Sequence, residues 1–428
     1  MKQSIHIGLG LINTSVGILT YDDTCSRTSH FAYCDQYLGS HSAFAISSDL
    51  PLRSGWQTIR HDHGHSPFPW SFSDTEPDQW GRKIVDRLFS KGCTNHNREL
   101  SAIDYLMAVD DFSRLGALRL SVENMPLTTN ADGRRRTPTL LDLRAIFDAS
   151  RRIELDRETE EDLLYLEGRG TSLGGARPKC SVINRADHLC LGKFASVNDQ
   201  RDIAKGEVLA LTLAQRCGIH AAKAERCTVD GVSASIIERF DRDFLTDRRV
   251  PYLSASAFLM RTEDDNPPAS YLDLLEALVT QGADWRTTAE ELFRRILFNV
   301  LINNTDDHSR NTGLLMLSAQ TWTLSPAFDI NPVPLKRPSS PYASKLYLFG
   351  DEPAETITQI INRADYFGLT SHDALKLLAP IVSVLTDWRR VAKSAHIGMT
   401  SSDLKAYTLA FEHDRLNEAK NLLSQAGF

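Results

Sequence analysis

The stretch from Leu301 to Leu315, "LINNTDDHSRNTGLL", places three asparagines, two aspartates, a histidine and an arginine between two apolar segments. The preceding segment, "LFRRILFNVLI", has apolar residues at the i, i+3, i+4 spacing of a buried helix face. The following segment, "LLMLS", predicts a short buried strand. Burial of polar groups costs free energy unless they are paired. The polar stretch therefore indicates a functional site, which needs support from the rest of the chain.

The spacing around this stretch points to phosphoryl transfer. Asn311 follows Asp306 by five residues, and Asp329 in "LSPAFDINP" comes after a predicted hairpin. In kinase chemistry one aspartate accepts the proton of the attacking hydroxyl, while a later asparagine and aspartate hold Mg²⁺ against the nucleotide phosphates. A polar turn with side-chain caps explains the Asp–Asn pair alone equally well. The position of Asp329 supports the kinase interpretation and leaves both alternatives open.

Two upstream residues have the character of a nucleotide-orienting pair. Lys193 lies in the predicted strand "HLCLGKFAS". Glu207 lies on the same predicted helix face as Leu211 and Ala214. A strand lysine paired with a helix glutamate orients the nucleotide in kinases. Taken singly, Glu207 is more simply a solvated glutamate, and Lys193 a lysine whose stem lies along the strand. The order and spacing of the two residues favour the pair.

Two further segments could contact a nucleotide. "TSLGGARPKCSV" is neither a Walker A sequence nor the kinase G-x-G-x-x-G loop, but its adjacent glycines would let backbone N–H groups approach a phosphate. A glycine turn before a strand is the alternative. "ASIIERFDR" predicts a strand that ends at Glu238, Arg239 and Phe240, where a hinge between lobes would present backbone groups to adenine.

Composition limits the classes of protein to consider. With 428 residues, 42% of them hydrophobic, the chain can form two or three packed domains and is not of the disordered class. A net charge of −7 without long basic runs argues against a dedicated nucleic-acid binder. Seven cysteines without a C-x-x-C pair indicate core residues in a reducing compartment. We see no signal peptide or membrane-length apolar run, so we expect a cytoplasmic protein.

The pattern along the chain predicts an α+β protein in three parts: a β-rich subdomain (1–125), a mixed α/β lobe (126–245) and a helical lobe (246–428). "SIHIGLG", "SVGILTYD", "SHFAYC" and "AFAIS" are predicted strands, and "PDQWGRKIVDRLFS" is a predicted helix. Thr287 and Glu290 form a predicted capping box for the helix that ends near Asn303. Residues 401–427 predict one amphipathic helix with a glycine stop.

These motifs, in this order, resemble the HipA family, the serine/threonine-kinase toxins of bacterial type II toxin–antitoxin modules. The similarity runs from "TSLGGARPK" through "KF", "ERFDR" and "NTDDHSRN" to "SPAFD", and more loosely over the N-terminal part. It implies a two-lobed protein-kinase-like fold with a mixed α/β N-lobe, a mainly helical C-lobe and an appended N-terminal β-rich subdomain.

The resemblance also implies residue roles. Asp306 would be the catalytic base, and Asn311 and Asp329 would bind Mg²⁺. Ser172 matches a serine whose autophosphorylation silences the kinase, since a phosphoserine and the ATP phosphates repel each other. With Glu207 added from its helix position, the expected ATP-binding residues are Gly174, Gly175, Ala176, Arg177, Pro178, Lys179, Lys193, Glu207, Glu238, Arg239, Phe240, His308, Asn311, Phe328 and Asp329.

The resemblance further implies a target and a partner. The target would be a serine of an aminoacyl-tRNA synthetase, whose phosphorylation stalls translation and arrests growth. The partner would be a small helix-turn-helix, HipB-like antitoxin bound to operator DNA, and formation of a homodimer is left open. Arg177 and Pro178 stand where the best-known member has other residues, and the "PDQWGRK" stretch belongs to only part of the family, which leaves the particular target open.

Two other classes of function are weighed against the kinase. A metal-dependent hydrolase could use His61, His63 and His65 of "RHDHGHSPFPW" as zinc ligands, although the glycine, serine and prolines nearby favour a surface loop. Together with Asp306, Asp307 and His308 they could form a dinuclear site. That hydrolase leaves Lys193 and Glu207 unexplained. An inactive pseudokinase that only sequesters a partner is the other alternative, and the presence of every expected catalytic residue counts against it.

Overall fold

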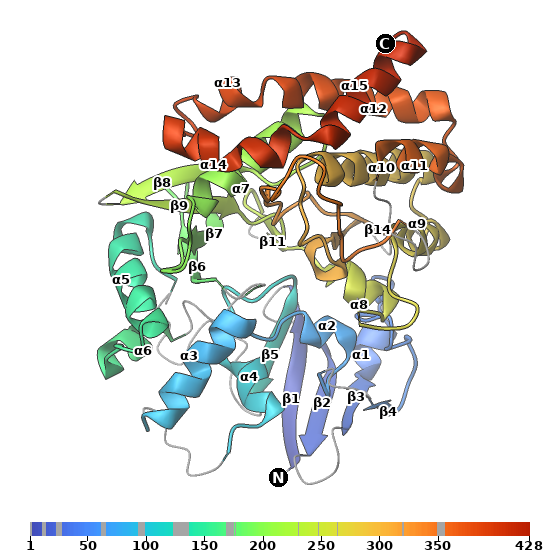
Figure 1. Ribbon diagram of the computed structural model, residues 1–428. Helices are drawn as coiled ribbons and strands as arrows, with labels where there is room; N and C mark the ends of the chain where they lie inside the picture. The colour runs from blue at the N-terminus through green and yellow to red at the C-terminus, as the bar shows by residue number, and fades with distance from the viewer. Residues whose placement is uncertain are drawn as a thin grey trace. The chain divides into compact units, whose positions relative to one another are not determined.

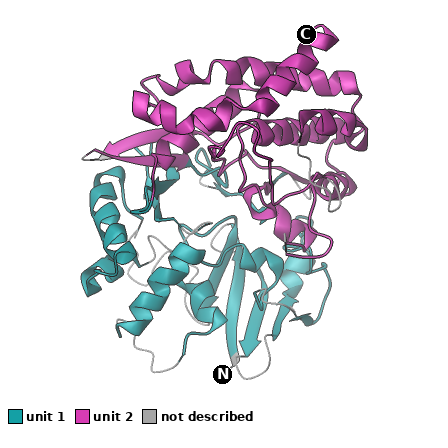
Figure 2. Ribbon diagram, viewed as in Figure 1, with its two compact units in different colours: residues 1–198, 238–253, 315–320 teal, residues 199–237, 254–314, 321–428 magenta. Residues whose placement is uncertain are grey.

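The structure is a computed structural model that describes residues 2–10, 14–22, 28–60, 66–92, 99–122, 137–167, 175, 177–229, 231–246, 248–262, 264–318, 321–348 and 356–428. Figure 2 shows its two compact units. The first comprises residues 1–198, 238–253 and 315–320, and the second comprises residues 199–237, 254–314 and 321–428. The predicted boundaries at residues 125 and 245 stay a prediction. Across the described ranges, no helix combines the length and the apolar character needed to span a membrane.

A five-stranded antiparallel sheet forms the N-terminal part of the first unit (Figure 1). Its strand order is β4-β3-β2-β1-β5. The strands are β1 (Lys2–Leu9), β2 (Ser15–Asp22), β3 (Thr28–Tyr33), β4 (Gln57–Arg60) and β5 (Leu118–Val122). Alternating buried residues give the sheet one core-facing side. The three predicted strands over β1, β2 and β3 are confirmed.

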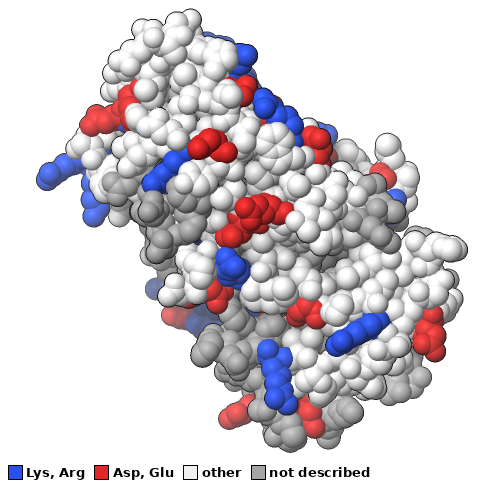
Figure 3. All heavy atoms as spheres, turned by 90° about the vertical axis from the view of Figure 1, so that its right-hand side faces the viewer, with Lys and Arg blue, Asp and Glu red and all other residues white. Residues whose placement is uncertain are grey.

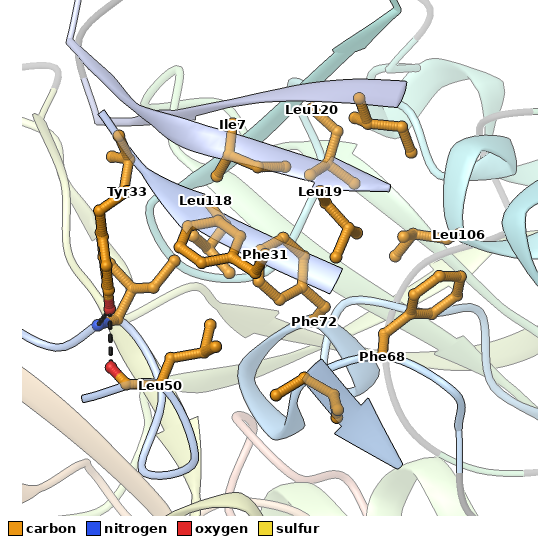
Figure 4. Packing of buried hydrophobic residues seen from close by; sticks show 14 of the residues in the cluster. Ile7, Leu19, Phe31, Tyr33, Leu50, Phe68, Phe72, Leu106, Leu118 and Leu120 are labelled. Carbon is orange, nitrogen blue, oxygen red and sulfur yellow. Dashed lines mark hydrogen bonds between the residues drawn. The ribbon is translucent and has the colours of Figure 1, made fainter. Parts of the chain in front are cut away.

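The core on this sheet combines strand and loop residues (Figure 4). Phe31 and Leu19 from the sheet pack with Phe68 and Phe72 from the segment around α2 (Trp70–Ser73). The predicted strand "AFAIS" is wrong, because residues 43–47 are irregular. Their backbone is held by tyrosine side chains instead: Phe44 N–H donates to Tyr37 Oη (3.2 Å) and Ile46 N–H donates to Tyr33 Oη (3.1 Å).

The rest of the first unit is helical with short strand pairs. The predicted helix after Pro77 is confirmed as α3 (Gln79–Ser90). The remaining elements are α1 (Asp35–Leu38), α4 (Ala102–Ala108), η1 (Leu140–Asp142), α5 (Leu143–Glu154), α6 (Glu160–Leu166), the antiparallel hairpin β6 (Lys179–Ile183) and β7 (Leu189–Phe194), and the pair β10 (Arg242–Asp243) and β11 (Arg248–Arg249). β12 (Tyr252–Ser254) follows.

The second unit contains most of the long helices. It begins with α7 (Ile203–Arg216) and the hairpin β8 (Ala224–Val229) and β9 (Val232–Glu238). α10 (Trp285–Leu301), α12 (Ser371–Thr386) and α15 (Asp414–Ala426) pack together (Figure 1). The others are α8 (Ala255–Leu259), α9 (Tyr271–Thr280), η2 (Ser309–Asn311), β14 (Thr321–Leu324), α11 (Ile357–Asn362), η3 (Ala364–Phe367), α13 (Trp388–Ala392) and α14 (Ser401–Phe411). β13 (Gly313–Ser318) begins in the second unit and continues into residues 315–318 of the first.

Two details of the helical prediction are wrong. The capping box of Thr287 and Glu290 does not form, because Asp284 caps α10 by accepting from Thr287 N–H at 2.8 Å. Asp284 lies three residues before Thr287, so the helix starts one turn earlier than the box predicts. The single C-terminal helix is in fact α14 and α15, interrupted at Glu412 and His413. The glycine stop at Gly427 is confirmed, with φ of +81°.

The charged side chains on the face in Figure 3 are interspersed, with lysines and arginines lying among aspartates and glutamates. This mixed pattern agrees with a net charge of −7 from 48 basic and 55 acidic residues. Among the described residues on that face, charges of one sign do not gather into the kind of patch that steers charged macromolecules.

Candidate functional site

The polar loop between α10 and β13 begins with structural asparagines. Asn303 adopts the left-handed conformation (φ +53°) and donates through Nδ2 to Val333 O at 2.6 Å. Arg415 Nη2 donates to Asn303 Oδ1 at 2.8 Å. Asn304 Nδ2 donates to Asn299 Oδ1 at 3.3 Å. These bonds fix the direction in which the chain leaves α10, so two of the three asparagines support the loop.

Asp307 is a buried carboxylate to which the kinase interpretation of the sequence gave no role; only the hydrolase alternative used it. It is 5% exposed, and Tyr271 Oη donates to its Oδ2 at 2.5 Å. Burial raises the pKa of Asp307 to about 6, while the hydrogen bond from Tyr271 lowers it. The available signal was a second aspartate directly after Asp306, which spacing alone could not assign. Asp307 therefore supports the loop from inside the unit.

Asp306, the expected catalytic base, lies on the open side of the same loop. Its side chain is 60% exposed, and Lys345 Nζ contacts its Oδ1 at 2.6 Å. Asn311 Nδ2 donates to the backbone oxygen of Asp306 at 3.0 Å. The loop thus brings Asp306 and Asn311 together and leaves the Asp306 carboxylate accessible from solvent.

A pocket of about 360 Å³ lies beside this loop. Its lining includes Asn311, Phe328 and Asp329, all expected from the sequence, together with Asp307. Asp329 adopts a left-handed backbone (φ +52°), and Asn331 Nδ2 donates to its Oδ1 at 3.1 Å. Backbone conformations of this kind are uncommon outside glycine and are enriched at functional sites. The pocket therefore gathers an amide and a carboxylate, the oxygen ligands that Mg²⁺ prefers.

Two expected residues lie on the loop outside the lining of this pocket. Asp306 and His308 belong to the same segment, and His308 is half-buried at the start of η2. The half-buried position of His308 agrees with a residue beside the site, whereas its contact with ATP stays a prediction.

Glu207 of α7 is buried, at 1% exposure. Ser235 Oγ donates to Glu207 Oε2 at 2.8 Å. The alternative of a solvated glutamate at the edge of the helix is therefore wrong. Lys193 belongs to the first unit and Glu207 to the second. Their pairing stays a prediction, as does the convergence of Lys193 with Asp306 and Asp329.

In the first unit, the end of the glycine-containing segment packs against the start of α3. Lys179 is 1% exposed, and its Nζ contacts Asp78 Oδ2 at 2.7 Å. Asp78 also caps α3 by accepting from Gly81 N–H at 2.6 Å. Lys193 lies directly opposite Lys179 in the β6–β7 hairpin. The buried partner of Lys179 was not foreseen, because Asp78 lies 101 residues away.

The other described residues of that segment are placed as follows. Gly175 accepts a hydrogen bond from Trp80 N–H at 3.4 Å, and Pro178 O accepts from Phe194 N–H at 3.0 Å. Arg177 is half-buried. Ser172, Gly174 and Ala176 lie outside the described residues, as do His61, His63 and His65. Among the residues that are described, no group of three His, Cys, Asp or Glu side chains could hold a metal ion.

The expected hinge residues have individual partners in the first unit. Arg239 is 6% exposed and pairs with Asp241, and it donates to Ser113 O at 3.0 Å. Its backbone N–H donates to Leu189 O at 3.0 Å. Glu238 contacts His188 at 3.3 Å, and the ring of Phe240 lies 6.2 Å from that of Tyr252. The Arg239 side chain thus supports the fold, and the adenine contact of this segment stays a prediction.

Comparison with known families decides the assignment. The model of the HipA-like C-terminal domain matches residues 171–388, which include the glycine-containing segment, Asp306, Asn311 and Asp329. This chain belongs to the HipA family. The resemblance in the sequence is thereby confirmed over half of the chain.

Solved structures show how far the HipA-like fold extends. HipA of Shewanella oneidensis MR-1, solved with HipB and its operator DNA, matches with a TM-score of 0.69 and 14% identity. The match covers 98% of this chain and 99% of that chain, so the N-terminal sheet is included. The proinflammatory kinase CtkA of Helicobacter pylori matches 60% of this chain and 94% of its own, with 15% identity and a TM-score of 0.46.

The predicted fold class is confirmed by the HipA structure. The chain has the two-lobed protein-kinase-like fold of HipA, with a mixed α/β N-lobe, a mainly helical C-lobe and an N-terminal β-rich subdomain. At 14% identity this likeness concerns the fold, and residue roles must be argued from the site itself.

Proposed function

We propose that this HipA-family chain is a serine/threonine-protein kinase toxin of a type II toxin–antitoxin module. It transfers the γ-phosphate of ATP to a serine of a protein needed for translation and thereby arrests growth. The observation that carries the proposal is the gathering of Asn311, Phe328 and Asp329 around one pocket, beside the loop that exposes Asp306. The family assignment adds the kinase-like fold in which such a site would work.

The chemistry of the pocket fits a bound Mg²⁺. The side-chain N–H of Asn311 donates to the backbone oxygen of Asp306, so the side-chain oxygen of Asn311 can bind the metal. Asp329 supplies a carboxylate oriented by Asn331. When bound, Mg²⁺ would neutralise charge on the ATP phosphates. Asp306 is the base in this proposal: it orients the attacking serine hydroxyl and accepts its proton.

The nucleotide contacts are proposed for the remaining residues. Lys193 would contact the ATP phosphates, with Glu207 orienting it. Residues 174–179 would cradle the phosphates, residues 238–240 would face the adenine, and His308 and Phe328 would complete the site. Because Lys179 has the buried partner Asp78, we assign it a supporting role within this phosphate loop.

The proposed biological context follows the family. The target is a serine of an aminoacyl-tRNA synthetase, and the partner is a small HipB-like helix-turn-helix antitoxin. The Shewanella HipA structure contains HipB and operator DNA, which supports an antitoxin that carries this chain to DNA. Autophosphorylation of Ser172 would switch the kinase off by placing a second phosphate against those of ATP.

Two substitutions test the roles of the acidic residues. Asp306→Asn removes the base, so phosphate transfer from labelled ATP to a cell lysate should fall at least 100-fold while ATP binding persists. Asp329→Asn removes a metal ligand, so the affinity for Mg·ATP, measured by calorimetry, should itself fall about tenfold or more. Equal loss of ATP affinity in both variants would contradict the assigned roles.

The same assay separates the alternative functions. A wild-type protein that binds Mg·ATP but transfers no phosphate, to itself or to a lysate protein, would favour the pseudokinase. A purified protein with stoichiometric zinc and no affinity for ATP would favour the hydrolase. Ser172→Ala should retain transfer to the target and lose self-inactivation, which a time course of activity after incubation with ATP measures.

A further inference from the structure

A segment that follows the pocket is built directly against the loop that carries Asp306. Tyr342 Oη donates to Asn304 O at 2.9 Å. Leu346 N–H donates to Asp307 O at 2.8 Å, and Ser344 Oγ donates to the same oxygen at 3.3 Å. These three bonds hold residues 342–346 beside residues 304–307 within the second unit.

Lys345 projects from this segment onto Asp306. Its Nζ lies 2.6 Å from Asp306 Oδ1, and the two side chains are 52% and 60% exposed. An exposed ion pair of this kind contributes little to stability. By contrast, the Ser344 hydroxyl and the Leu346 backbone N–H on either side of Lys345 both donate to Asp307 O, so the segment stays in place without the lysine side chain. The contact between Lys345 and Asp306 therefore contributes little to the stability of the fold.

We propose that Lys345 is a positioning residue for phosphoryl transfer, acting through Asp306; this role rests on the proposed kinase function. The ammonium holds the Asp306 carboxylate toward open solvent, from which a substrate serine must approach. It also places a positive charge beside the point where negative charge develops. Preorganised charges of this kind stabilise a transition state more than the ground state.

Phosphoryl transfer from ATP to the serine needs no proton from Lys345. The serine Oγ forms a bond to the γ-phosphorus while the bond from that phosphorus to the bridging oxygen of ATP breaks. The serine proton passes to the Asp306 carboxylate, and the electron pair of the broken bond leaves with ADP. Lys345 remains an ammonium throughout. Because the attacking oxygen must lie within hydrogen-bond reach of Asp306, about 3 Å, the ammonium that contacts this carboxylate is a close neighbour of the transferred group.

The position of Lys345 distinguishes it from Lys336, a second lysine that precedes this segment. Lys336 is exposed and lies nine residues earlier, between the pocket and Tyr342. Replacement of either lysine removes one exposed positive charge from the same stretch of chain. Only Lys345 contacts Asp306, so a difference between the two variants reports that contact rather than the net charge.

The experiment compares Lys345→Ala, Lys345→Arg and Lys336→Ala in the full-length chain. Phosphate transfer from labelled ATP gives kcat and the KM for ATP, calorimetry gives the affinity for Mg·ATP, and a thermal melt reports folding. We expect Lys345→Ala to lower kcat about 10- to 100-fold, with ATP affinity and the melting temperature unchanged. Lys345→Arg keeps a cation on a long stem and should recover part of kcat, and Lys336→Ala should match the wild type.

Several outcomes overturn this role. Lys345→Ala with the kcat of the wild type shows that the contact is without effect, and a faster variant shows that the ion pair blocks the base. A parallel loss of kcat, ATP affinity and melting temperature makes Lys345 structural. If the wild type transfers no phosphate, the proposed kinase function fails and this role with it. An active wild type with an equally active Lys345→Ala variant overturns the role alone.

Discussion

At the scale of single residues, the "ERFDR" motif shows how a sequence signature can serve the fold. Asp241 is fully buried, and it accepts hydrogen bonds from Arg239 Nε at 2.6 Å and from Gly116 N–H at 2.6 Å. Arg242 also contacts Asp241, at 2.7 Å. Burial raises the pKa of Asp241, but the two guanidinium groups hold it well below its usual range. Asp241 is thus an ionised carboxylate that joins the strand end to the loop around Gly116.

Removal of this carboxylate should destabilise the protein strongly. In Asp241→Ala, Arg239 and Arg242 lose their buried counter-charge, and breaking such a pair costs about 3–5 kcal/mol. Urea unfolding at pH 7 measures the change in the free energy of unfolding. The matched control is Asp243→Ala, two residues further along, where a half-buried carboxylate accepts from Leu245 N–H and Thr246. Similar losses in both variants would contradict the role of Asp241.

At the scale of elements, the break between α14 and α15 is set by a buried histidine. His413 is 2% exposed, and its Nε2 lies 3.0 Å from Leu301 O at the end of α10. Burial, together with the charge of Arg415, lowers the pKa of His413 to about 4. Continuing the helix would move this side chain away from α10. The contact therefore outweighs the helical periodicity of the sequence.

This histidine predicts a pH dependence of stability. Its pKa falls from 6.5 unfolded to about 4 folded, so between these values the unfolded chain binds more protons and stability rises with pH. When the pH is lowered from 6.5 to 4, protonation linked to His413 should reduce the free energy of unfolding by up to about 3 kcal/mol. His413→Gln should lose that part of the dependence in urea unfolding at pH 7, 5.5 and 4.5. The exposed His396→Gln is the control, and an equal slope in all three proteins would contradict the prediction.

The packing of α7 against α14 depends on a glycine within a helix. A Cβ built on Gly206 would lie 2.3 Å from the Tyr407 Oη, which donates to Asp202 O at 2.9 Å. Alanine usually stabilises a helix interior by about 1 kcal/mol relative to glycine. Here Gly206→Ala should destabilise the protein by about 1–3 kcal/mol, because the overlap must be relieved. Thermal and urea unfolding measure the loss.

The Tyr407→Ala variant tests whether the overlap with the tyrosine causes this loss. In Tyr407→Ala the ring is absent, so Gly206→Ala should cost little or become stabilising. If the cost of Gly206→Ala is the same with and without Tyr407, helix packing is not its cause.

Elements were predictable where one local signal dominated. β1, β2, β3 and α3 followed from alternation or helical periodicity and are confirmed. The failures at residues 43–47 and at Glu412 and His413 have a common cause, since each depends on a contact with a distant residue. Tyr33 and Tyr37 accept hydrogen bonds from the backbone of residues 43–47, and the Leu301 backbone oxygen contacts His413. Periodicity in a single sequence does not contain such partners.

At the scale of the whole molecule, the sequence indicated the residues of the candidate site but not the distant residues that hold that site in place. Asn311 and Asp329 were expected from their order along the chain and Phe328 from the family resemblance, and all three line one pocket. Asp307 with Tyr271, and Lys179 with Asp78, were not expected, because each pair joins residues far apart in sequence. Catalytic side chains follow a spacing that the chemistry dictates, whereas supporting partners need only be near in space.

The proposed ligand should stabilise the folded chain as a whole. A ligand at 100 times its Kd raises the free energy of unfolding by about 2.7 kcal/mol when it binds only the native state. We therefore expect Mg·ATP to raise the melting temperature of the wild type and of Asp306→Asn, since the proposed role of Asp306 concerns the substrate hydroxyl and not ATP binding. Asp329→Asn should show a much smaller rise at the same concentration, because the variant lacks the carboxylate that we propose as a metal ligand in the pocket. Chelation of Mg²⁺ with EDTA should reduce the rise in the wild type to that of ATP alone. Equal shifts in both variants, or a shift that survives EDTA in full, would separate ATP binding from the pocket of Asn311 and Asp329.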